Sequence, residues 1–229
     1  MARIKSAQRH RLTLAHRRTV ERELIEVSTQ LQLSNRRCAE ANDELRRTGD
    51  KDLLTGVYNQ RWFDERLGLE LRSASRRNVP LSLLFLDLDH FSLFNEVYGR
   101  AAGDECLASV AAAIKRALKR AIDAAARVGG EEFAILLPDT NAQGAVVVAT
   151  KILALVRSLN IPHERSPTAN CVTASIGVEA RIPMPRLTSS VVTCAADQQL
   201  HQAKKLGRNR LSIHESALGR HRSAEDKFF

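Results

Sequence analysis

The sequence has few cysteines and no pattern of histidines that suggests a metal site. The four cysteines in 229 residues lie far apart and form none of the close pairs that zinc sites and redox motifs require. The seven histidines show no ligand spacing. We therefore expect no imidazole metal site, and we expect the cysteines to be reduced packing residues. They are Cys38, Cys106, Cys171 and Cys194.

Long apolar runs are also absent. No segment approaches the ~20 apolar residues that span a bilayer, and the first 20 residues contain no continuous apolar segment of signal-peptide type. A hydrophobic content of 44% with 27% charged residues is ordinary for a folded protein with a buried core. We therefore expect a cytoplasmic protein without a membrane-embedded part.

The net charge of +9 suggests an anionic partner. Part of this charge lies in residues 1–50, which hold 11 Lys or Arg against 7 Asp or Glu, a net of +4. Acidic residues are interleaved there and aromatic residues are absent, which is typical of a solvated helical face. A nucleic-acid partner is therefore the minor alternative.

Small and apolar residues recur at heptad spacing between residues 17 and 48. This pattern predicts a long N-terminal helix, over residues 1–48, that forms a homodimeric coiled coil or a higher homo-oligomer. A single amphipathic helix packed on its own domain is the alternative. Gly49 is expected to end the helix. The predicted seam consists of Val20, Leu24, Val27, Leu31, Ser34, Cys38, Ala41 and Leu45.

Residues 49–214 show the mixed pattern of an α/β domain. The nearly continuous apolar run at 81–89, LSLLFLDLD, predicts a central strand that is covered on both faces. We expect a central mixed β-sheet flanked by helices, followed by a flexible tail over residues 215–229. Further strands are predicted at 125–128, 133–137, 172–178 and 210–213, with helices that include 107–118, 146–156 and about 191–206.

Asp87 and Asp89 close the predicted central strand. The two-residue period of a strand points both side chains the same way, at a place where a charged group can leave the core. They are candidate ligand-binding residues. The alternative is that they cap the following helix, where aspartate is common.

The stretch RVGGEEFAILL, residues 127–137, predicts a β-hairpin whose tip lies at Gly129–Glu132. Its glycines permit positive φ and a close approach of backbone. If the hairpin lies beside the central strand, Glu131, Glu132 and Asp87 converge at one edge. Three carboxylates without histidine or cysteine suit Mg²⁺, which proteins commonly bind together with substrate phosphates. This combination points to a nucleoside triphosphate.

Two basic and two polar residues complete the candidate site. Lys204 and Arg208 are four residues apart around a predicted helix end, so both can reach one anionic group, although basic residues are common at helix ends in any case. Asn95 and Asp104 could recognise a base, since a carboxylate accepts from the N1 and N2 donors that guanine has. Asp104 could instead be an N-cap.

Five motifs in order and spacing resemble the GGDEF domain of diguanylate cyclases. They cover about residues 50–213 and are DLLTGVYNQRWF, LDLDHFSLFNEVYGRAAGDECL, RVGGEEFAILLP, VTASIGV and AADQQLHQAKKLGRNR. Five motifs in register are far more specific than any one of them. The resemblance implies a palm-like nucleotidyl cyclase fold, in which two domains each bring one GTP to form cyclic di-GMP.

The resemblance also implies roles for individual residues and two Mg²⁺ or Mn²⁺ ions per active site. Asp87, Glu131 and Glu132 would be catalytic. Implied metal ligands are Asp87, the carbonyl of Leu88 and Glu132, with Glu131 near the attacking 3′-hydroxyl as base or second metal ligand. Implied substrate contacts are Phe91, Ser92, Asn95, Asp104, Lys204 and Arg208.

Four positions depart from the family pattern. Ser92 replaces a usual lysine, which predicts weaker GTP binding, and no metal ligand is lost. A catalytically silent GGDEF module that binds GTP or cyclic di-GMP is therefore the main alternative to an active cyclase. A cyclase that uses ATP is disfavoured by Asp104. The other departures are Gln60, Arg100 and His201.

Arg120 and Asp123 form an R-x-x-D pair, with five residues between Asp123 and Gly129. The resemblance implies that this pair is an inhibitory site for the product, cyclic di-GMP. Without the adjoining motif, Arg120 would simply end a basic helix and Asp123 would lie in a turn.

Overall fold

The computed structural model describes residues 28–37 and 49–214. Contacts along the chain divide it after Gly49 into two units, which we describe separately. In the first unit, residues 28–37 are helical and exposed, and they include two positions of the predicted seam, Leu31 and Ser34. The other seam positions and the predicted tail lie outside the described residues. Dimerisation through this helix remains a prediction.

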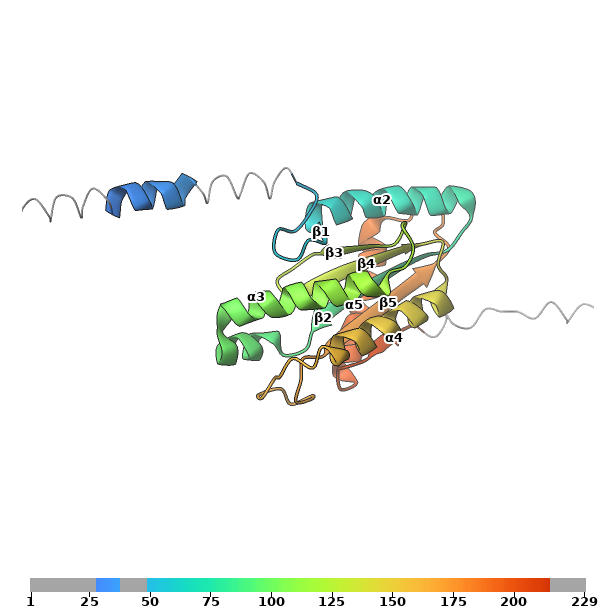
Figure 1. Cartoon of the computed structure of the whole chain (residues 1–229). Helices are drawn as coiled ribbons and strands as arrows, with labels where there is room; N and C mark the ends of the chain where they lie inside the picture. Colours follow the sequence, from blue (N-terminus) through green and yellow to red (C-terminus); the bar gives the residue numbers. More distant parts are fainter. Residues whose placement is uncertain (1–27, 38–48, 215–229) are drawn as a thin grey trace, which may run out of the picture. The chain divides into compact units, whose positions relative to one another are not determined.

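The second unit contains a six-stranded mixed sheet in the order β1-β3-β4-β2-β5-β6 (Figure 1). β2 pairs antiparallel with β4 and with β5, whereas β1 pairs parallel with β3 and β5 pairs parallel with β6. The predicted fold class is confirmed. The strands are β1 (Tyr58–Asn59), β2 (Leu81–Leu88), β3 (Ala124–Arg127), β4 (Glu132–Pro138), β5 (Ala174–Arg181) and β6 (Leu211–Ile213).

Four helices cover the two faces of the sheet (Figure 1). One face packs against α3 and α4, and the other packs against α2 and α5. Asparagine side chains cap two of the helices: Asn59 accepts from the Trp62 amide at the start of α2, and Asn141 accepts from the Gly144 amide at the start of α4. The helices are α2 (Gln60–Arg77), α3 (Phe91–Ala117), α4 (Ala142–Ser158) and α5 (Ser189–Lys205).

The continuous apolar run of β2 results from this double coverage. Leu84 and Leu86 pack in the core beneath α3 and α4, whereas Leu83 packs in the core beneath α2 and α5. The same alternation directs Asp87 toward the α2 and α5 side. The prediction of a central strand buried on both faces is confirmed.

Several predicted boundaries and one burial prediction need correction. The strand expected at 172–178 begins at Ala174 and continues to Arg181, because Val172 instead bonds to the Ile161 carbonyl outside the sheet. The helix expected at about 191–206 covers Ser189–Lys205. Cys194 is exposed, so it is not a packing residue, whereas Cys106 and Cys171 are buried as expected. Within the described ranges, no helix has the length and apolarity needed to cross a membrane.

Candidate active site

The end of β2 and the start of β4 form the centre of the candidate site. Ala124–Arg127 and Glu132–Pro138 pair antiparallel as a hairpin, and its second strand pairs antiparallel with β2. In that register Asp87 is the partner of Glu132, and on the other side of β2 it is the partner of Ser175. The predicted hairpin and its predicted place beside the central strand are both confirmed.

Of the two glycines at the hairpin tip, Gly129 is required for the space that it leaves rather than for a special backbone conformation. Neither Gly129 nor Gly130 has a positive φ, so that expectation was wrong. A Cβ atom at Gly129 would lie 2.3 Å from Oε2 of Glu132, so the glycine makes room for this carboxylate. Glu132 is exposed and borders a hollow of about 290 Å³ between α2 and α5.

Negative charge is concentrated at this edge. Asp87 is 8% exposed, and its Oδ1 lies 2.9 Å from Nζ of Lys204. Burial raises the pKa of Asp87 and repulsion from Asp89 adds to this, while Lys204 and Arg208 act in the opposite direction. Burial also raises the pKa of Glu131, and repulsion from Asp87 and Glu132 raises it further. At this edge, therefore, the negative charge of the carboxylates exceeds the positive charge of the nearby basic side chains.

The residues fit a hard cation that is completed by a substrate. Among the described residues, no three His, Cys, Asp or Glu side chains form a ready metal-binding group. The three carboxylates that the sequence places at this edge are thus not arranged as a complete metal site. Asp87 and Glu132 remain register partners, and they offer only oxygen donors. Mg²⁺ is commonly held by one or two carboxylates together with phosphates, which suits this set.

Helix α5 brings the two basic residues to the site through a close contact with β5. A Cβ atom at Gly177 would lie 2.1 Å from the Leu200 nitrogen and 2.2 Å from the Ala196 oxygen, so only glycine permits this approach. Lys204 lies in the last turn of α5. Arg208 follows with a φ of 62°, in the left-handed region, and its charge acts on Asp87.

A kink in α3 forms the second part of the candidate site. Gly99 has a φ of 82° and a ψ of 163°, which breaks the helical geometry within α3. Across the kink, Asn95 from the turn before it lies against Gly103 from the turn after it, where a Cβ atom would be 2.0 Å from Oδ1 of Asn95. This Oδ1 is buried and has no hydrogen-bond partner in the part of the chain that the structure describes. Asp104 follows Gly103, is exposed and lies inside the helix, so the N-cap alternative for Asp104 is wrong.

Phe91 and Ser92 differ in accessibility. Phe91 is 4% exposed, and its ring stacks on Phe94 with 5.8 Å between ring centroids. Any contact of Phe91 with a ligand would therefore come from its backbone. Leu88 is 1% exposed, so the same limit applies to it. Ser92 is exposed on the first turn of α3.

Asp89 stabilises the local structure rather than facing a ligand. It lies one residue beyond β2 and is 2% exposed. Its carboxylate accepts hydrogen bonds from the Thr173 hydroxyl at 2.8 Å, the Ser175 hydroxyl at 2.7 Å and the Asn209 amide at 3.0 Å. Asp89 thus joins β2, β5 and the segment after α5. Neither alternative proposed for Asp89 from the sequence, ligand contact or helix cap, describes this role.

Sequence reasoning missed an ion pair that supports the hairpin. Arg127 donates to the Gly130 carbonyl from Nε at 3.0 Å and from Nη2 at 2.7 Å. Its Nη1 lies 3.3 Å from Oδ1 of Asp52, which also accepts from the amide and hydroxyl of Thr55. Both residues of the ion pair were visible in the sequence, one in DLLTG and the other as the arginine before the glycines. Only the fold brings the two segments together.

Arg120 and Asp123 lie in the turn between α3 and β3, since α3 ends at Ala117. Arg120 forms an ion pair with Asp123, whose side chain is only 4% exposed. Arg120 also donates to the Pro138 carbonyl at 2.9 Å and to the Thr140 hydroxyl at 2.5 Å. The pair raises the pKa of Arg120, chiefly through the hydrogen bonds that the guanidinium donates to the Asp123 carboxylate. In this structure the guanidinium is therefore engaged within the domain.

A family model described as "Diguanylate cyclase, GGDEF domain" matches residues 50–210. The chain belongs to the GGDEF family. Diguanylate cyclase A of Treponema denticola is 34% identical over 180 residues, which are 77% of this chain and 47% of that protein. This chain thus spans about half the length of the curated relatives that it matches.

Solved structures agree with this assignment of the GGDEF domain. Diguanylate cyclase SiaD of Pseudomonas aeruginosa, in complex with its activator SiaC, has a TM-score of 0.66 and 32% identity, covering 92% of this chain and 79% of SiaD. The coiled coil and GGDEF domain of DgcB from Caulobacter crescentus, in complex with c-di-GMP, has a TM-score of 0.63 and 30% identity. That match covers 85% of this chain and 99% of the DgcB chain.

Proposed function

We propose that this protein is a diguanylate cyclase that condenses two GTP molecules into cyclic di-GMP and two pyrophosphates. The observation that carries the proposal is the register pairing of Asp87 with Glu132 beside Lys204, in a GGDEF domain. The named activities of relatives such as diguanylate cyclase A support the same reaction. Each domain holds one GTP, so two domains must face each other.

Each group has a role that follows from its chemistry. Asp87, Glu132 and the Leu88 carbonyl would hold Mg²⁺ or Mn²⁺, two ions per site, and the bound metal would supply charge neutralisation at the phosphates and lower the pKa of the 3′-hydroxyl. Glu131 lies beside this edge and, with its raised pKa, is suited to take up the proton of that hydroxyl.

The remaining residues bind and orient GTP. Lys204 and Arg208 would contact the phosphates, which requires Lys204 to leave Asp87 when substrate and cation arrive. The buried Oδ1 of Asn95, which has no hydrogen-bond partner among the described residues, could accept a hydrogen bond, and guanine offers N–H donors on its edge. Asp104 would accept from the same edge, which adenine could not satisfy in this way.

The test is conversion of GTP by the purified protein in the presence of Mg²⁺, with separation of the nucleotides. Asp87→Asn and Glu132→Gln should each lower turnover by at least ~100-fold while thermal melting stays close to that of the wild type. Full activity in either variant would overturn the assignment of these ligands. Binding of GTP or cyclic di-GMP by the wild type without turnover would instead identify a sensor module.

A further inference from the structure

A buried histidine outside all the family motifs contacts the turn between β2 and α3. His163 lies in the loop between α4 and β5 and is 1% exposed, although its neighbours Glu164 and Arg165 are exposed. The loop is closed on itself, because the His163 amide donates to the Asn170 carbonyl at 3.0 Å. This bond therefore fixes the backbone of the loop at the residue whose ring is buried.

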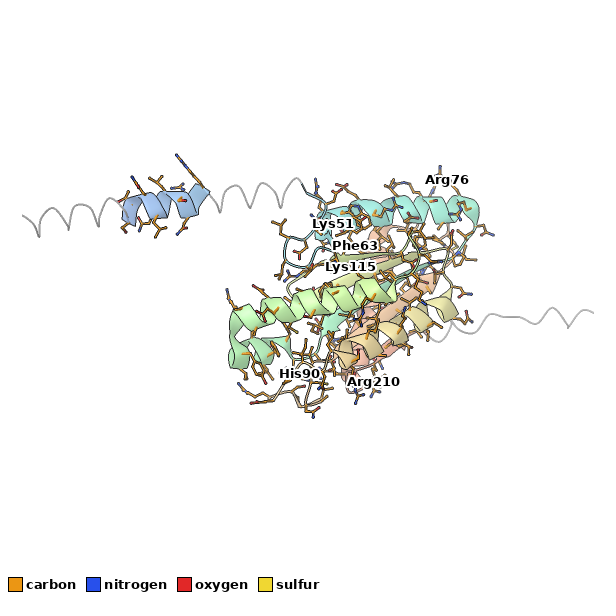
Figure 2. All side chains as sticks on the ribbon, viewed as in Figure 1. Lys51, Phe63, Arg76, His90, Lys115 and Arg210 are labelled. Atoms are coloured by element: carbon orange, nitrogen blue, oxygen red, sulfur yellow. The ribbon has the colours of Figure 1, made fainter. Side chains whose placement is uncertain are left out.

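The ring of His163 binds the backbone at a strained residue. His90 has a φ of 58°, a left-handed conformation that is unfavourable for a non-glycine residue. Nε2 of His163 lies 3.1 Å from the His90 carbonyl oxygen, which also accepts from the Phe94 amide at 3.2 Å. Because a carbonyl can only accept, Nε2 carries the proton. The side chain of His90, which is labelled in Figure 2, also contacts this loop. Its Nε2 lies 3.0 Å from the Thr168 hydroxyl.

The same ring contacts the first turn of α3. It lies edge-on to the Phe94 ring, with 5.5 Å between centroids and an interplanar angle of 86°. Among the described residues no side chain forms a cap hydrogen bond at the start of helix α3, so the ring of His163 adds a contact at an otherwise uncapped end. One side chain thus fixes both the left-handed turn and the helix that follows it.

We propose that His163 is a positioning residue for nucleotide binding, and this rests on the proposed function. The turn that it holds connects Leu88 to the helical turns that carry Ser92 and Asn95. Its conformation therefore sets the separation between the phosphate end and the base end of the candidate site.

Packing alone does not account for a histidine at this position. Nδ1 of His163 is buried and has no hydrogen-bond partner within residues 28–37 and 49–214, which costs stability that an apolar side chain would not lose. The part of the ring that forms a specific contact is Nε2. A leucine at this position would lack the hydrogen-bond donor, whereas a glutamine would keep one.

The experiment measures binding of 3′-deoxy-GTP with Mg²⁺ by calorimetry, since this nucleotide lacks the attacking hydroxyl and cannot be cyclised. His163→Leu should weaken binding about tenfold, the loss expected for one hydrogen bond, while the melting temperature stays within a few degrees of the wild type. His163→Gln, whose amide nitrogen can reach the same carbonyl, should bind within about twofold of the wild type. Arg165→Ala, a control in the same loop, removes only an exposed ion pair with Glu96 and should bind normally.

Each outcome decides the matter. Wild-type affinity in His163→Leu, or equally weak binding in His163→Gln, would overturn the positioning role. If the leucine variant does not fold, His163→Asn replaces it, because its shorter amide cannot reach the His90 carbonyl, and it should bind more weakly than His163→Gln. No binding by the wild type would instead overturn the proposed function itself, and with it the role of His163.

Discussion

Lys204 contacts the carboxylate that a divalent cation would need. Its Nζ lies 2.9 Å from Oδ1 of Asp87, so the lysine and the cation compete for one group. Lys204→Met should therefore tighten binding of Mn²⁺ in the absence of nucleotide by about three- to tenfold, because it removes both the competitor and a nearby positive charge. Electron paramagnetic resonance of free Mn²⁺ measures this.

A matched control separates the effect of the direct Lys204–Asp87 contact from the effect of removing a positive charge. Arg208→Met removes a positive charge that also acts on Asp87 but that forms no ion pair with it in the described residues. Its effect on Mn²⁺ affinity should be smaller than that of Lys204→Met. Equal or weaker Mn²⁺ binding in Lys204→Met than in the wild type would contradict the competition.

Glu131 should make the stability of the metal-free domain depend on pH. Burial and the neighbouring Asp87 and Glu132 carboxylates raise its pKa in the folded state above the ordinary 4.5. The folded state thus binds this proton more tightly than the unfolded chain, so the contribution of Glu131 is fully present below pH 4.5 and is lost as the pH rises through the folded pKa. In Glu131→Gln, the free energy of unfolding should lose the part of its decrease with pH that comes from Glu131.

Urea unfolding of both proteins between pH 4 and pH 8, without divalent cations, measures this difference. The free energy of unfolding of the wild type should fall more steeply with pH than that of Glu131→Gln. Parallel curves would show that Glu131 titrates alike in the folded and unfolded chains.

At the scale of elements, the contact between α5 and β5 sets the position of the basic residues. Gly177→Ala would place a Cβ atom against the backbone of α5, at Leu200 and Ala196, where no side chain can give way. We expect a loss of about 1–3 kcal/mol of stability and weaker GTP binding, because α5 carries Lys204 toward Asp87. Thermal melting and calorimetry measure the two effects.

Gly68→Ala is the matched control for this substitution. Gly68 lies inside α2, and its new Cβ atom would meet Arg72 at 3.5 Å, an ordinary contact. Because alanine favours a helix by about 0.5–1 kcal/mol over glycine, this variant should melt at the same or a higher temperature. A Gly177→Ala protein that melts and binds like Gly68→Ala would show that α5 can shift without consequence.

For the whole molecule, the first prediction concerns the predicted coiled coil. Deletion of residues 1–48 should leave a folded domain, since the core described here lies within residues 50–214. Cyclisation by the shortened protein should fall and become strongly dependent on protein concentration, because two domains must meet without a tether. Specific activity is measured over a dilution series. Equal activity with and without the segment at the lowest concentration would contradict the predicted tether.

The second prediction for the whole molecule concerns control by product. We propose that cyclic di-GMP binds Arg120 and Asp123 and holds two domains with their active sites apart. Arg120→Ala should therefore raise the plateau of product formation while leaving the initial rate in dilute product nearly unchanged. The variant also loses bonds to Pro138 and Thr140, so a lower melting temperature is expected. Progress curves measure the plateau.

A control on α2 tests whether the effect is specific to this site. Arg66→Ala removes the ion pair between the exposed Arg66 and the partly buried Glu70 on α2, and its progress curve should match that of the wild type. Superimposable curves for Arg120→Ala and the wild type, with no plateau in either, would assign Arg120 to the internal contacts of the turn alone.

Local patterns in the sequence determined the parts of the fold that depend on local rules. The apolar run at 81–89 predicted a strand buried on both faces, and the two glycines before Glu131 predicted the hairpin, because burial and turn geometry leave a signature within a few residues. Motif spacing predicted the family. Boundaries were less accurate where contacts distant in sequence decide them, as at Val172, which bonds to Ile161 instead of joining β5.

Only the tertiary structure decided how the site is assembled. Asp89 resembled Asp87 in the sequence. In the structure its buried carboxylate accepts hydrogen bonds from three donors in distant segments, which gives it a structural role. Lys204 was expected to contact phosphate. In the structure it forms an ion pair with Asp87, because a buried carboxylate is stabilised by a nearby positive charge. His163 carried no signal at all. Such roles arise from neighbours brought together by folding, and the energy of a buried polar group depends on those neighbours rather than on its place in the chain.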